Sequence, residues 1–363
     1  MKKTFLCSQE SPLHQQIAEE EKLMISEIYI KGYLGGDDLM LLSDLSKNGR
    51  LRLLDMYDVR ELYTNDLEED GTRDCFPFFD NDRIEEVRLP QISSIDYPMF
   101  CNCRNLKSIE FPDTINGLCD CFMSDCPNIE EIYVPSNLRI AYDGRYDDDY
   151  CFVGSGKRFV SDFNRWPEED EEIPGSFFTN DGVLYEDGVC GISLHRYPAG
   201  DERKGFSIPE GVTNIDENAF NGNPFLRRLI IPKSVNNIEN NPILGCMNLE
   251  TIIFKNEKFE MFTCKDWTYA ININPWGLCQ LPGLKDIYLY ADNPENIDFG
   301  LFDGLENIGE VTLHVPCFCA EKYRNHEVEY GSALSSSKKY IEAWRRFKQI
   351  EEFDPVDFID DLS

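Results

Sequence analysis

The segment 211–232 has the sequence GVTNIDENAFNGNPFLRRLIIP, and four of its positions form a pattern. Ile215 and Phe220 are separated by four residues, Asn223 follows after two more, and Leu226 after another two. The same spacing, with Cys, Asn or Leu at the third position, recurs along the chain, so this segment is one unit of an internal repeat. The other units are Ile95, Phe100, Cys103, Leu106; Leu118, Met123, Cys126, Ile129; Ile238, Ile243, Cys246, Leu249; Ile273, Leu278, Leu281, Leu284; Ile297, Phe302, Leu305, Ile308; and a degenerate copy at Phe78, Asn81, Ile84.

Each unit continues into a short strand. Leu226, Leu229 and Ile231 form an L-x-x-I-x-L pattern that ends at Pro232. The step from Leu226 to the equivalent Leu249 is 23 residues, within the range of about 20 to 29 that is typical of leucine-rich repeats. A single coil cannot bury its apolar side alone, so neighbouring coils are expected to stack around one core, with their strands in a parallel sheet.

These units resemble the BspA-like (treponemal-type) leucine-rich repeats, whose form is L-x-x-I-x-L-P-x-x-V-x-x-I-x-x-x-A-F-x-x-C-x-x-L. Residues 211–220 follow it closely, and the resemblance covers most of residues 25 to 350. Residues 180–185 and 195–200 are similar to a hairpin often inserted between blocks of these repeats. The family is known for surface and host-interaction proteins of bacteria, so the resemblance implies binding rather than catalysis.

We therefore predict an α/β leucine-rich-repeat solenoid, rich in strands, with a curved parallel sheet of about 23-residue coils and helical N- and C-terminal caps. Near the N-terminus, Asp37 is expected to cap a helix that carries Leu39, Leu42 and Leu45. A second helix is expected to begin at 335–337. Its apolar stripe consists of Tyr340, Trp344, Phe347 and Ile350.

The repeat blocks divide the chain into six predicted segments. They are an N-terminal cap with helices and first strands (1–77), a first repeat block (78–135), an irregular acidic island with a hairpin (136–204), a second repeat block (205–316), a C-terminal helical cap (317–351) and a tail (352–363).

The charge of the chain excludes some partners. The 363 residues include 35 Lys and Arg against 67 Asp and Glu, a net charge of −32, which repels nucleic acid and anionic membranes. No apolar run approaches the ~18 residues that span a bilayer. The first residues are basic, but the apolar stretch after them is shorter than that of a signal peptide. We therefore expect a cytoplasmic protein; a surface or secreted location, common in the resembled family, is the alternative.

The residues of catalytic chemistry form no known motif. The four histidines, His14, His195, His314 and His326, lie far apart in the sequence and outside any metalloprotease or triad pattern. The acidic run 147–149 lacks the residue order of a calcium loop, so we expect solvated loops there and at 168–172, with a calcium site as the alternative. We predict no enzymatic activity, no cofactor and no metal.

The 14 cysteines are scattered, without the C-x2-C pairs of a zinc site. Free thiols are expected, and disulfides stay open as an alternative. Cys103, Cys126 and Cys246 share one repeat position, where a small apolar residue with a weak donor suits a packed corner.

A binding surface is predicted on the outer face of the sheet. The residue before the last apolar position of each strand points outward, and these residues are Arg88, Glu110, Tyr133, Ile230, Ile253, Tyr288 and Thr312. We predict Tyr133, Ile230, Ile253 and Tyr288 as anchors, with Arg228 and Asp286 supplying complementary charge. The predicted function is recognition of a protein ligand with a basic surface by a monomer.

Three alternatives stay open. The island or a terminal segment could cover the outer face and bury this row, which would leave a structural scaffold. Trp166, Tyr185 or Tyr288 could instead stack on sugar rings in a carbohydrate-binding or adhesion module. An enzyme site within the island is the third.

Overall fold

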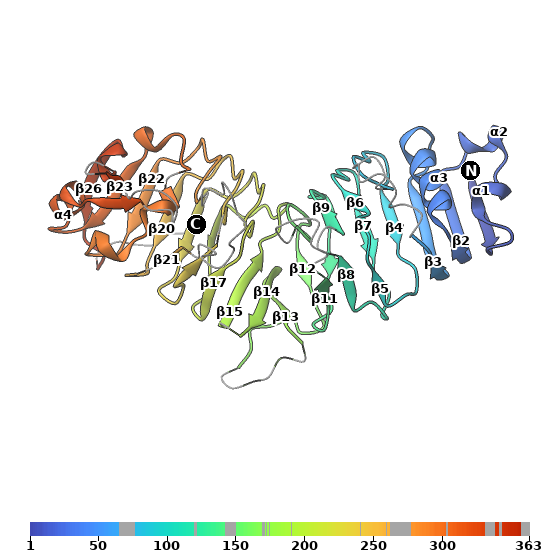
Figure 1. Ribbon diagram of the computed structural model, residues 1–363, viewed down its shortest axis with the longest axis horizontal. Coiled ribbons are helices and arrows are strands. Elements are labelled where there is room, and N and C mark those ends of the chain that lie inside the picture. Colours follow the sequence, from blue (N-terminus) through green and yellow to red (C-terminus); the bar gives the residue numbers. More distant parts are fainter. Residues whose placement is uncertain are drawn as a thin grey trace. The chain divides into compact units, whose positions relative to one another are not determined.

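The computed structural model describes most of the chain as two compact units. The residues outside the description are 65–76, 120–121, 142–149, 169–170, 172, 174, 190, 240, 259, 262–276, 303, 331–337, 341–342 and 357–363. Unit 1 consists of residues 1–187 and 198–200, and unit 2 of residues 188–197 and 201–363. Figure 1 labels their elements along the chain.

Unit 1 is built on parallel ladders of short strands. Its largest sheet has the order β1 (Lys2–Cys7), β2 (Glu27–Leu34), β3 (Leu53–Leu62), β4 (Glu86–Arg88) and β7 (Ser108–Glu110), all parallel. Three smaller parallel sets join β5 (Ser94–Ile95), β8 (Gly117–Cys119) and β11 (Arg139–Ala141); β6 (Phe100–Cys101) and β9 (Met123–Ser124); and β10 (Ile132–Tyr133) and β12 (Phe159–Val160). Because one coil contributes to three ladders in turn, as with β7, β8 and β9, the unit is a β-solenoid.

A hairpin interrupts the coils where the sequence predicted one. Strands β13 (Phe177–Asn180) and β14 (Val183–Gly188) pair antiparallel around Asp181 and Gly182. Both turn residues have positive φ, 50° and 78°, the conformation of the tight hairpin turns that Asp-Gly favours.

Unit 2 repeats the solenoid architecture. Its main parallel sheet has the order β16 (Gly205–Ser207), β18 (Arg228–Ile231), β20 (Thr251–Phe254), β22 (Asp286–Leu289), β23 (Thr312–Pro316) and β26 (Gln349–Phe353). A second parallel ladder contains β15 (Gly191–Arg196), β17 (Val212–Ile215), β19 (Asn237–Ile238) and β21 (Glu260–Met261), and β24 (Val328–Tyr330) pairs antiparallel with β25 (Lys338–Tyr340). The predicted leucine-rich-repeat architecture is confirmed in both blocks.

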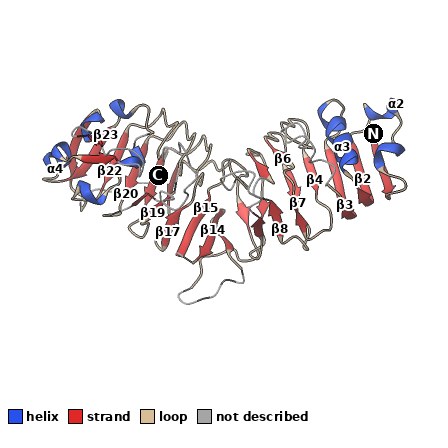
Figure 2. Cartoon of the chain, viewed as in Figure 1, coloured by secondary structure: helices blue, strands red, loops and turns tan. Residues whose placement is uncertain are grey.

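Helices are short and few among the described residues (Figure 2). They are α1 (Leu13–Gln16), α2 (Glu19–Lys22), α3 (Gly36–Lys47) and α4 (Ala320–Asn325), with 3-10 turns η3 (Pro294–Asn296), η4 (Phe299–Phe302), η5 (Ile308–Glu310) and η6 (Trp344–Arg346). None of the helices in the described ranges has the length and apolar character needed to cross a bilayer.

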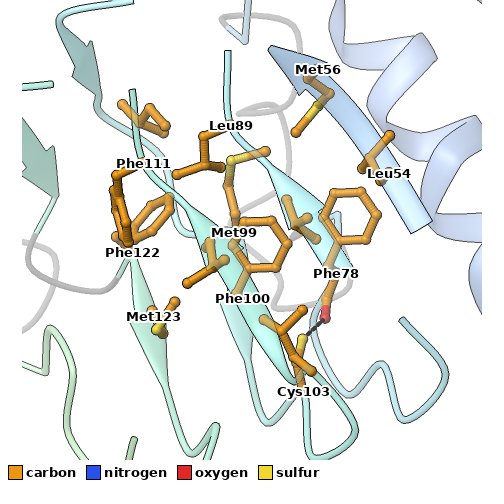
Figure 3. Packing of buried hydrophobic residues seen from close by; sticks show 14 of the residues in the cluster. Leu54, Met56, Phe78, Leu89, Met99, Phe100, Cys103, Phe111, Phe122 and Met123 are labelled. Atoms are coloured by element: carbon orange, nitrogen blue, oxygen red, sulfur yellow. Dashed lines mark hydrogen bonds between the residues drawn. The ribbon is translucent and has the colours of Figure 1, made fainter. Parts of the chain in front are cut away.

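The third repeat position closes each coil. The thiol of Cys103 donates to the carbonyl of Phe78 in the preceding coil at 3.0 Å (Figure 3), and Cys246 donates to Phe220 at 2.9 Å. Asn223 makes the equivalent hydrogen bond with its side-chain amide: its Nδ2 donates to the carbonyl of Asp201 at 2.9 Å. A small donor therefore suits this position in the coils that have Cys or Asn there, whereas Leu281 and Leu305 occupy it in later coils.

Asn223 makes two further bonds that cysteine cannot make. Its Oδ1 accepts from the backbone N–H groups of Phe225 and Leu226, both at 2.8 Å. In the coil of Cys246, the N–H of Leu249 donates instead to the backbone carbonyl of Cys246 at 3.1 Å.

The residue before the corner has positive φ in six coils, which restricts it to types that tolerate this conformation. These residues are Asp80, Asn102, Asp125, Gly222, Gly245 and Gln280.

Aromatic rings stack from coil to coil inside unit 1 (Figure 3). Phe78 lies flat on Phe100 with ring centroids 5.2 Å apart, and Phe100 meets the edge of Phe122 at 5.7 Å. All three rings are fully buried. Burying each ring contributes about 1.5 to 3 kcal/mol, so the column joins successive coils into one core.

The predicted N-terminal helix is present as α3, but its cap differs. Leu39, Leu42 and Leu45 are buried as expected. The N-cap is Gly35, whose N–H donates to Oδ2 of Asp38 at 3.2 Å, so the capping carboxylate is that of Asp38 and not of Asp37. The main sheet of unit 1 begins before this helix, at strand β1.

The predicted C-terminal helix is wrong. Residues 338–340 form strand β25, Trp344–Arg346 form one 3-10 turn, and β26 completes the main sheet at Gln349–Phe353. The apolar spacing of Trp344, Phe347 and Ile350 is compatible with a helix. Strand β26 instead pairs with β23, with Ile350 opposite Leu313, so tertiary pairing overrides the local pattern.

The register of the preceding coil was also predicted wrongly. Thr312 pairs with Asp286, and His314 pairs with Tyr288, so the row beside Tyr288 contains His314 rather than Thr312. The 3-10 turn η5 at Ile308–Glu310 takes up two residues before the strand starts. The strand pattern of this coil therefore lies two residues later than in the others.

We predict that the two corner residue types differ in energy. Asn223→Ala removes one donor and an acceptor of two backbone N–H groups in a fully buried site, so it is expected to destabilise the protein by about 2 to 3 kcal/mol. Cys246→Ala is the matched control at the same repeat position and should cost about 1 kcal/mol. Urea unfolding measures both; equal losses would contradict the role given to the Asn223 side chain.

Candidate recognition surface

The outer face of the main sheet in unit 1 carries aromatic rings and charges. Ile28 and Ile30 of β2 and Leu54 and Met56 of β3 are buried in the core, so the residues between them project outward. We call this outer surface the unit-1 face. It consists of Lys2, Thr4, Tyr29, Lys31, Asp55, Tyr57, Asp58, Arg88 and Glu110. All of these except Glu110 also line a pocket of about 270 Å³, together with Ile30.

Arg88 is the centre of this face. Its Nη1 donates to Oδ2 of Asp55 at 2.9 Å, and its Nε and Nη2 donate to the two carboxylate oxygens of Glu110 at 2.7 and 3.0 Å. The guanidinium also lies 4.5 Å from the centroid of the Tyr57 ring. Hydrogen bonds to Glu110 and Asp55 raise the pKa of Arg88 above its usual value. The group is held in one orientation by three neighbours.

The ring of Tyr29, the second tyrosine of the face, also lies under a cation. The ammonium of Lys2 lies 3.9 Å from the centroid of the Tyr29 ring, within the range of a cation–π contact. Next to it, Nζ of Lys31 lies 2.8 Å from Oδ2 of Asp58. The hydrogen bond between them lowers the pKa of Asp58 and raises that of Lys31. The unit-1 face is thus an ordered array of tyrosines and ion pairs.

In unit 2 the outer face of the main sheet brings together five of the predicted site residues. Register places Arg228, Thr251 and Asp286 in one row. The next row holds Ile230, Ile253, Tyr288, His314 and Glu351. We call these two rows the unit-2 face. Apart from Glu351 on β26, its members come from strands that the repeat pattern placed side by side.

The expectation that Ile230 and Ile253 are open to solvent is wrong. Ile230 is 2% exposed and Ile253 is fully buried. Their neighbours Leu229, Ile231, Ile252 and Phe254 point into the core and are buried as well, so both faces of these two strands are covered.

Tyr288 lies in a cluster that the sequence pattern did not predict. His314 stacks on its ring with centroids 4.1 Å apart, and Phe353 meets its edge at 5.3 Å. Nε2 of His314 lies 2.8 Å from Oδ1 of Asp286. Partial burial, with the nearby charge of Asp286, raises the pKa of Tyr288. The two-residue shift of this coil hid His314 from the predicted row.

Tyr133 stands apart from the other predicted anchors. It lies in β10 of unit 1, in a two-stranded sheet with β12, and is 37% exposed. Partial burial and the charges of Asp162 and Asp113 raise its pKa. The structure therefore does not place Tyr133 in the same sheet as the five predicted site residues on the unit-2 face.

Of the three aromatic residues of the carbohydrate alternative, Tyr185 is buried, whereas Trp166 and Tyr288 are partly exposed. Tyr185 is fully buried and stacks on Phe178 with centroids 5.3 Å apart. Trp166 meets the edges of the same two rings at 5.4 and 5.6 Å. Tyr185 is thus unavailable to a sugar. The acidic run 147–149 lies outside the described residues, and in the other run Glu171 pairs with Arg165.

The tyrosines of the unit-1 face were missed because their segment was assigned to a cap. The alternation Ile28-Tyr29-Ile30-Lys31 does contain the information, since it is the pattern of a half-buried strand.

Among the described cysteines, Cys7, Cys103, Cys126, Cys246, Cys279, Cys317 and Cys319 are free thiols. Burial raises the pKa of Cys246 to about 12 and that of Cys101 to about 11. A thiol that stays protonated is a poor nucleophile.

Three histidines each pair with a carboxylate, as in His14 with Asp38 at 2.7 Å.

Comparison with known proteins identifies the repeats. Residues 76–154 and 200–280 match the model of the BspA type leucine rich repeat region, in six copies. Within these two segments the chain carries BspA-type leucine-rich repeats. No curated protein matches the sequence of this chain.

Solved structures of low sequence identity also resemble this chain. A leucine-rich cell surface protein from Faecalibacterium prausnitzii is 18% identical, with 91% of this chain and 73% of that chain covered and a TM-score of 0.45. A leucine-rich repeat protein from Eubacterium ventriosum is 14% identical, with 82% and 73% covered and a TM-score of 0.42. The pneumococcal vaccine antigen PcpA is 14% identical, with 81% and 76% covered and a TM-score of 0.36.

We predict that alkylation separates the described thiols by burial. Native protein treated with iodoacetamide at about pH 8, below the raised pKa of Cys246, should be modified at the exposed Cys317 and left unmodified at Cys246, Cys126 and Cys103. Peptide mass spectrometry gives the modified fraction of each site, with urea-unfolded protein as the control. Rapid labelling of Cys246 in the folded protein would contradict its corner role.

A second prediction concerns Glu239 in unit 2. Burial and the charge of Asp216 raise the pKa of Glu239. The folded state then binds more protons than the unfolded state above the ordinary glutamate value of about 4.3, so this group lowers stability as pH rises through that window. Glu239→Gln can still accept the hydrogen bond from the N–H of Glu217.

The Glu239→Gln variant is therefore expected to be more stable than the wild type, with a larger gain at roughly pH 8 than at roughly pH 5. Urea unfolding at the two pH values measures the gain. Glu217→Gln is the control, because that substitution keeps the hydrogen bond between the Glu217 backbone and Glu239. A gain that is the same at both pH values would contradict the raised pKa.

Proposed function

We propose that this BspA-type protein is a non-enzymatic recognition module that binds a protein ligand through the outer faces of its parallel sheets. The observation that carries the proposal is the unit-1 face, where Tyr29 and Tyr57 line one pocket and each ring lies under a cation.

The order of this face favours binding. A side chain that is already immobilised loses little conformational entropy when a ligand arrives. Arg88 holds Tyr57 while Asp55 and Glu110 hold Arg88, so the arrangement exists before any partner binds. Tyrosine and arginine are also the residue types that dominate the energy of protein interfaces.

On the unit-2 face, Tyr288, Arg228 and Asp286 remain proposed contact residues. Tyr288 and Arg228 are partly exposed, and the side chain of Asp286 is 36% exposed. Ile230 and Ile253 do not belong to this contact set, because they are buried. Tyr133 remains a proposed contact on a separate part of unit 1.

The net charge of the chain indicates the surface charge expected of the partner. With a net charge of −32, the protein attracts ligands with basic surfaces and speeds their encounter at low salt. We propose a protein ligand of this kind and look for it first among exposed surface proteins, given the common location of the family.

We predict that the double variant Tyr29→Ala, Tyr57→Ala loses ligand binding. Photo-cross-linking of the wild type to bacterial and host surface proteins identifies ligands, and biolayer interferometry then measures their affinity. Removal of two ring anchors should weaken binding at least about tenfold. Tyr63→Ala is the matched control, because Tyr63 is 49% exposed but follows the end of β3.

If the double variant and the control bind every captured ligand as the wild type does, the unit-1 face is not the recognition surface. Circular dichroism of the double variant must match the wild type for the comparison to count. An association rate that does not fall with rising salt would contradict the proposed basic partner.

A further inference from the structure

Unit 1 contains a second pocket, with a volume of about 340 Å³. It lies where strands β2 and β3 end and where the chain enters β5. It shares no lining residue with the pocket of the unit-1 face. Its volume is at the small end of the range of roughly 300 to 1,000 Å³ for small-molecule sites. Two tyrosines and several polar side chains line it, among them Tyr33, Tyr63, Gln9, Arg60, Glu61 and Ser93.

Backbone hydrogen bonds hold the walls of the second pocket. The N–H of Tyr63 donates to the carbonyl of Leu34 at 2.9 Å. The carbonyl of Ser93 accepts from the N–H groups of Asn116 and Gly117 in the next coil, at 2.9 and 3.1 Å. The segments that carry the lining side chains are therefore fixed, and a ligand meets a site that is largely formed before it arrives.

The two tyrosine rings supply apolar surface to the second pocket. Tyr63 is 49% exposed, so much of its ring is open to a ligand. Tyr33 is partly exposed, and a Cβ atom at Gly35 would lie 3.1 Å from its hydroxyl. The missing side chain at Gly35 therefore lets the Tyr33 ring lie close to the backbone. The face of an aromatic ring carries partial negative charge, which attracts the C–H groups on one face of a sugar ring.

The polar side chains of the second pocket have unused hydrogen-bonding capacity. Within the described ranges, no hydrogen bond involves the side chains of four exposed lining residues, which are Gln9, Arg60, Glu61 and Ser93. An amide, a guanidinium, a carboxylate and a hydroxyl together offer both donors and acceptors. On the unit-1 face, by contrast, Arg88 already bonds Asp55 and Glu110. Ligand hydroxyls can thus replace water in the second pocket without breaking an existing pair.

The charge of the second pocket favours a neutral ligand. Among the described residues, Arg60 and Glu61 are the charged side chains that line it, and their charges cancel. The chain as a whole carries a net charge of −32, which repels anions. A cationic ligand finds no excess of negative charge within the pocket. A neutral ligand rich in hydroxyl groups is the class that fits both the charge and the unused donors and acceptors.

We infer that the second pocket binds a neutral mono- or disaccharide. The ring of Tyr63 stacks on the apolar face of one sugar ring, and the polar side chains around it bond the hydroxyls. The site is separate from the positions at which the sequence suggested sugar stacking, which were Trp166, Tyr185 and Tyr288. The inference goes beyond the proposed function, because it names a different ligand at a site that shares no residue with the unit-1 face.

Saturation-transfer difference NMR on the full chain tests the inference. The probes are the methyl glycosides of glucose, galactose, mannose and N-acetylglucosamine and the disaccharides maltose, lactose and cellobiose, with glucuronate as the charged comparison. At least one neutral probe should bind with a dissociation constant of roughly 1 mM, as expected for a ligand of this size. Glucuronate should bind more weakly than that probe.

Two substitutions of exposed residues should weaken this binding. Tyr63→Ala removes the stacking ring and Arg60→Met removes a hydrogen-bonding group, and each should raise the dissociation constant at least about fivefold. Phe318→Ala is the matched control, because Phe318 is an aromatic residue of unit 2 that is 91% exposed. It should leave sugar binding unchanged. Circular dichroism checks that the three variants fold as the wild type does.

A fluorine label locates the bound sugar. Trifluoromethylphenylalanine in place of Tyr63 keeps an aromatic ring in the pocket, and its fluorine NMR signal should shift when the neutral probe is added. The same label in place of Phe318 should not respond. This readout does not depend on the loss of binding in the substituted variants.

Three results would overturn the inference. The first is no saturation transfer to any neutral probe at roughly 10 mM, and the second is binding that both Tyr63→Ala and Arg60→Met leave unchanged. The third is a label at position 63 that responds to a captured protein ligand and to none of the sugars, which would assign the pocket to that protein. The sugar readout does not depend on Tyr29 or Tyr57, so this inference and the proposed function fail separately.

Discussion

Stacking of coils is the constraint on which both units depend. One coil cannot bury its apolar side chains alone, so each coil must bury them against the next coil. The corner position links the two with a side-chain bond, from the thiol of Cys103 to the carbonyl of Phe78 or from the amide of Asn223 to that of Asp201. Beside these bonds the rings of Phe78, Phe100 and Phe122 form a continuous column. Successive coils are thus joined both by hydrogen bonds at the corner position and by packing of apolar rings.

The same stacking produces the surfaces available for function. A parallel ladder sets equivalent residues of successive coils side by side, so a row of outward residues forms a surface that no single coil could present. In unit 1 this row combines Tyr29 with Asp55 and Arg88, and the cations of Lys2 and Arg88 lie over the rings of Tyr29 and Tyr57. In unit 2 it combines Ile230, Ile253 and Tyr288, where apolar side chains meet. Two chemically different faces arise from one architecture.

Departures from the regular repeat concentrate in the last coils of unit 2. The turn η5 delays strand β23 by two residues and brings His314 onto the ring of Tyr288. Strand β26 then takes the place of the expected helix, and its Phe353 joins that cluster. These residues contact side chains from strands far apart in the sequence. The end of the sheet is therefore shaped by packing that the repeat does not encode.

The sequence by itself determined the repeat, the coil length of 23 residues, the residues that face the core and the corner position, because each of these depends on local spacing along the chain. Leu226, Leu229 and Ile231 could be placed inside on that basis, and they are buried. Only the tertiary structure decided what lies over the outward residues. Tyr29 and Tyr57 line a pocket and Ile253 is buried, although all three alternate with core residues in the same way. The physical reason is that strand alternation sets the direction of a side chain, whereas its exposure depends on distant residues that pack against it.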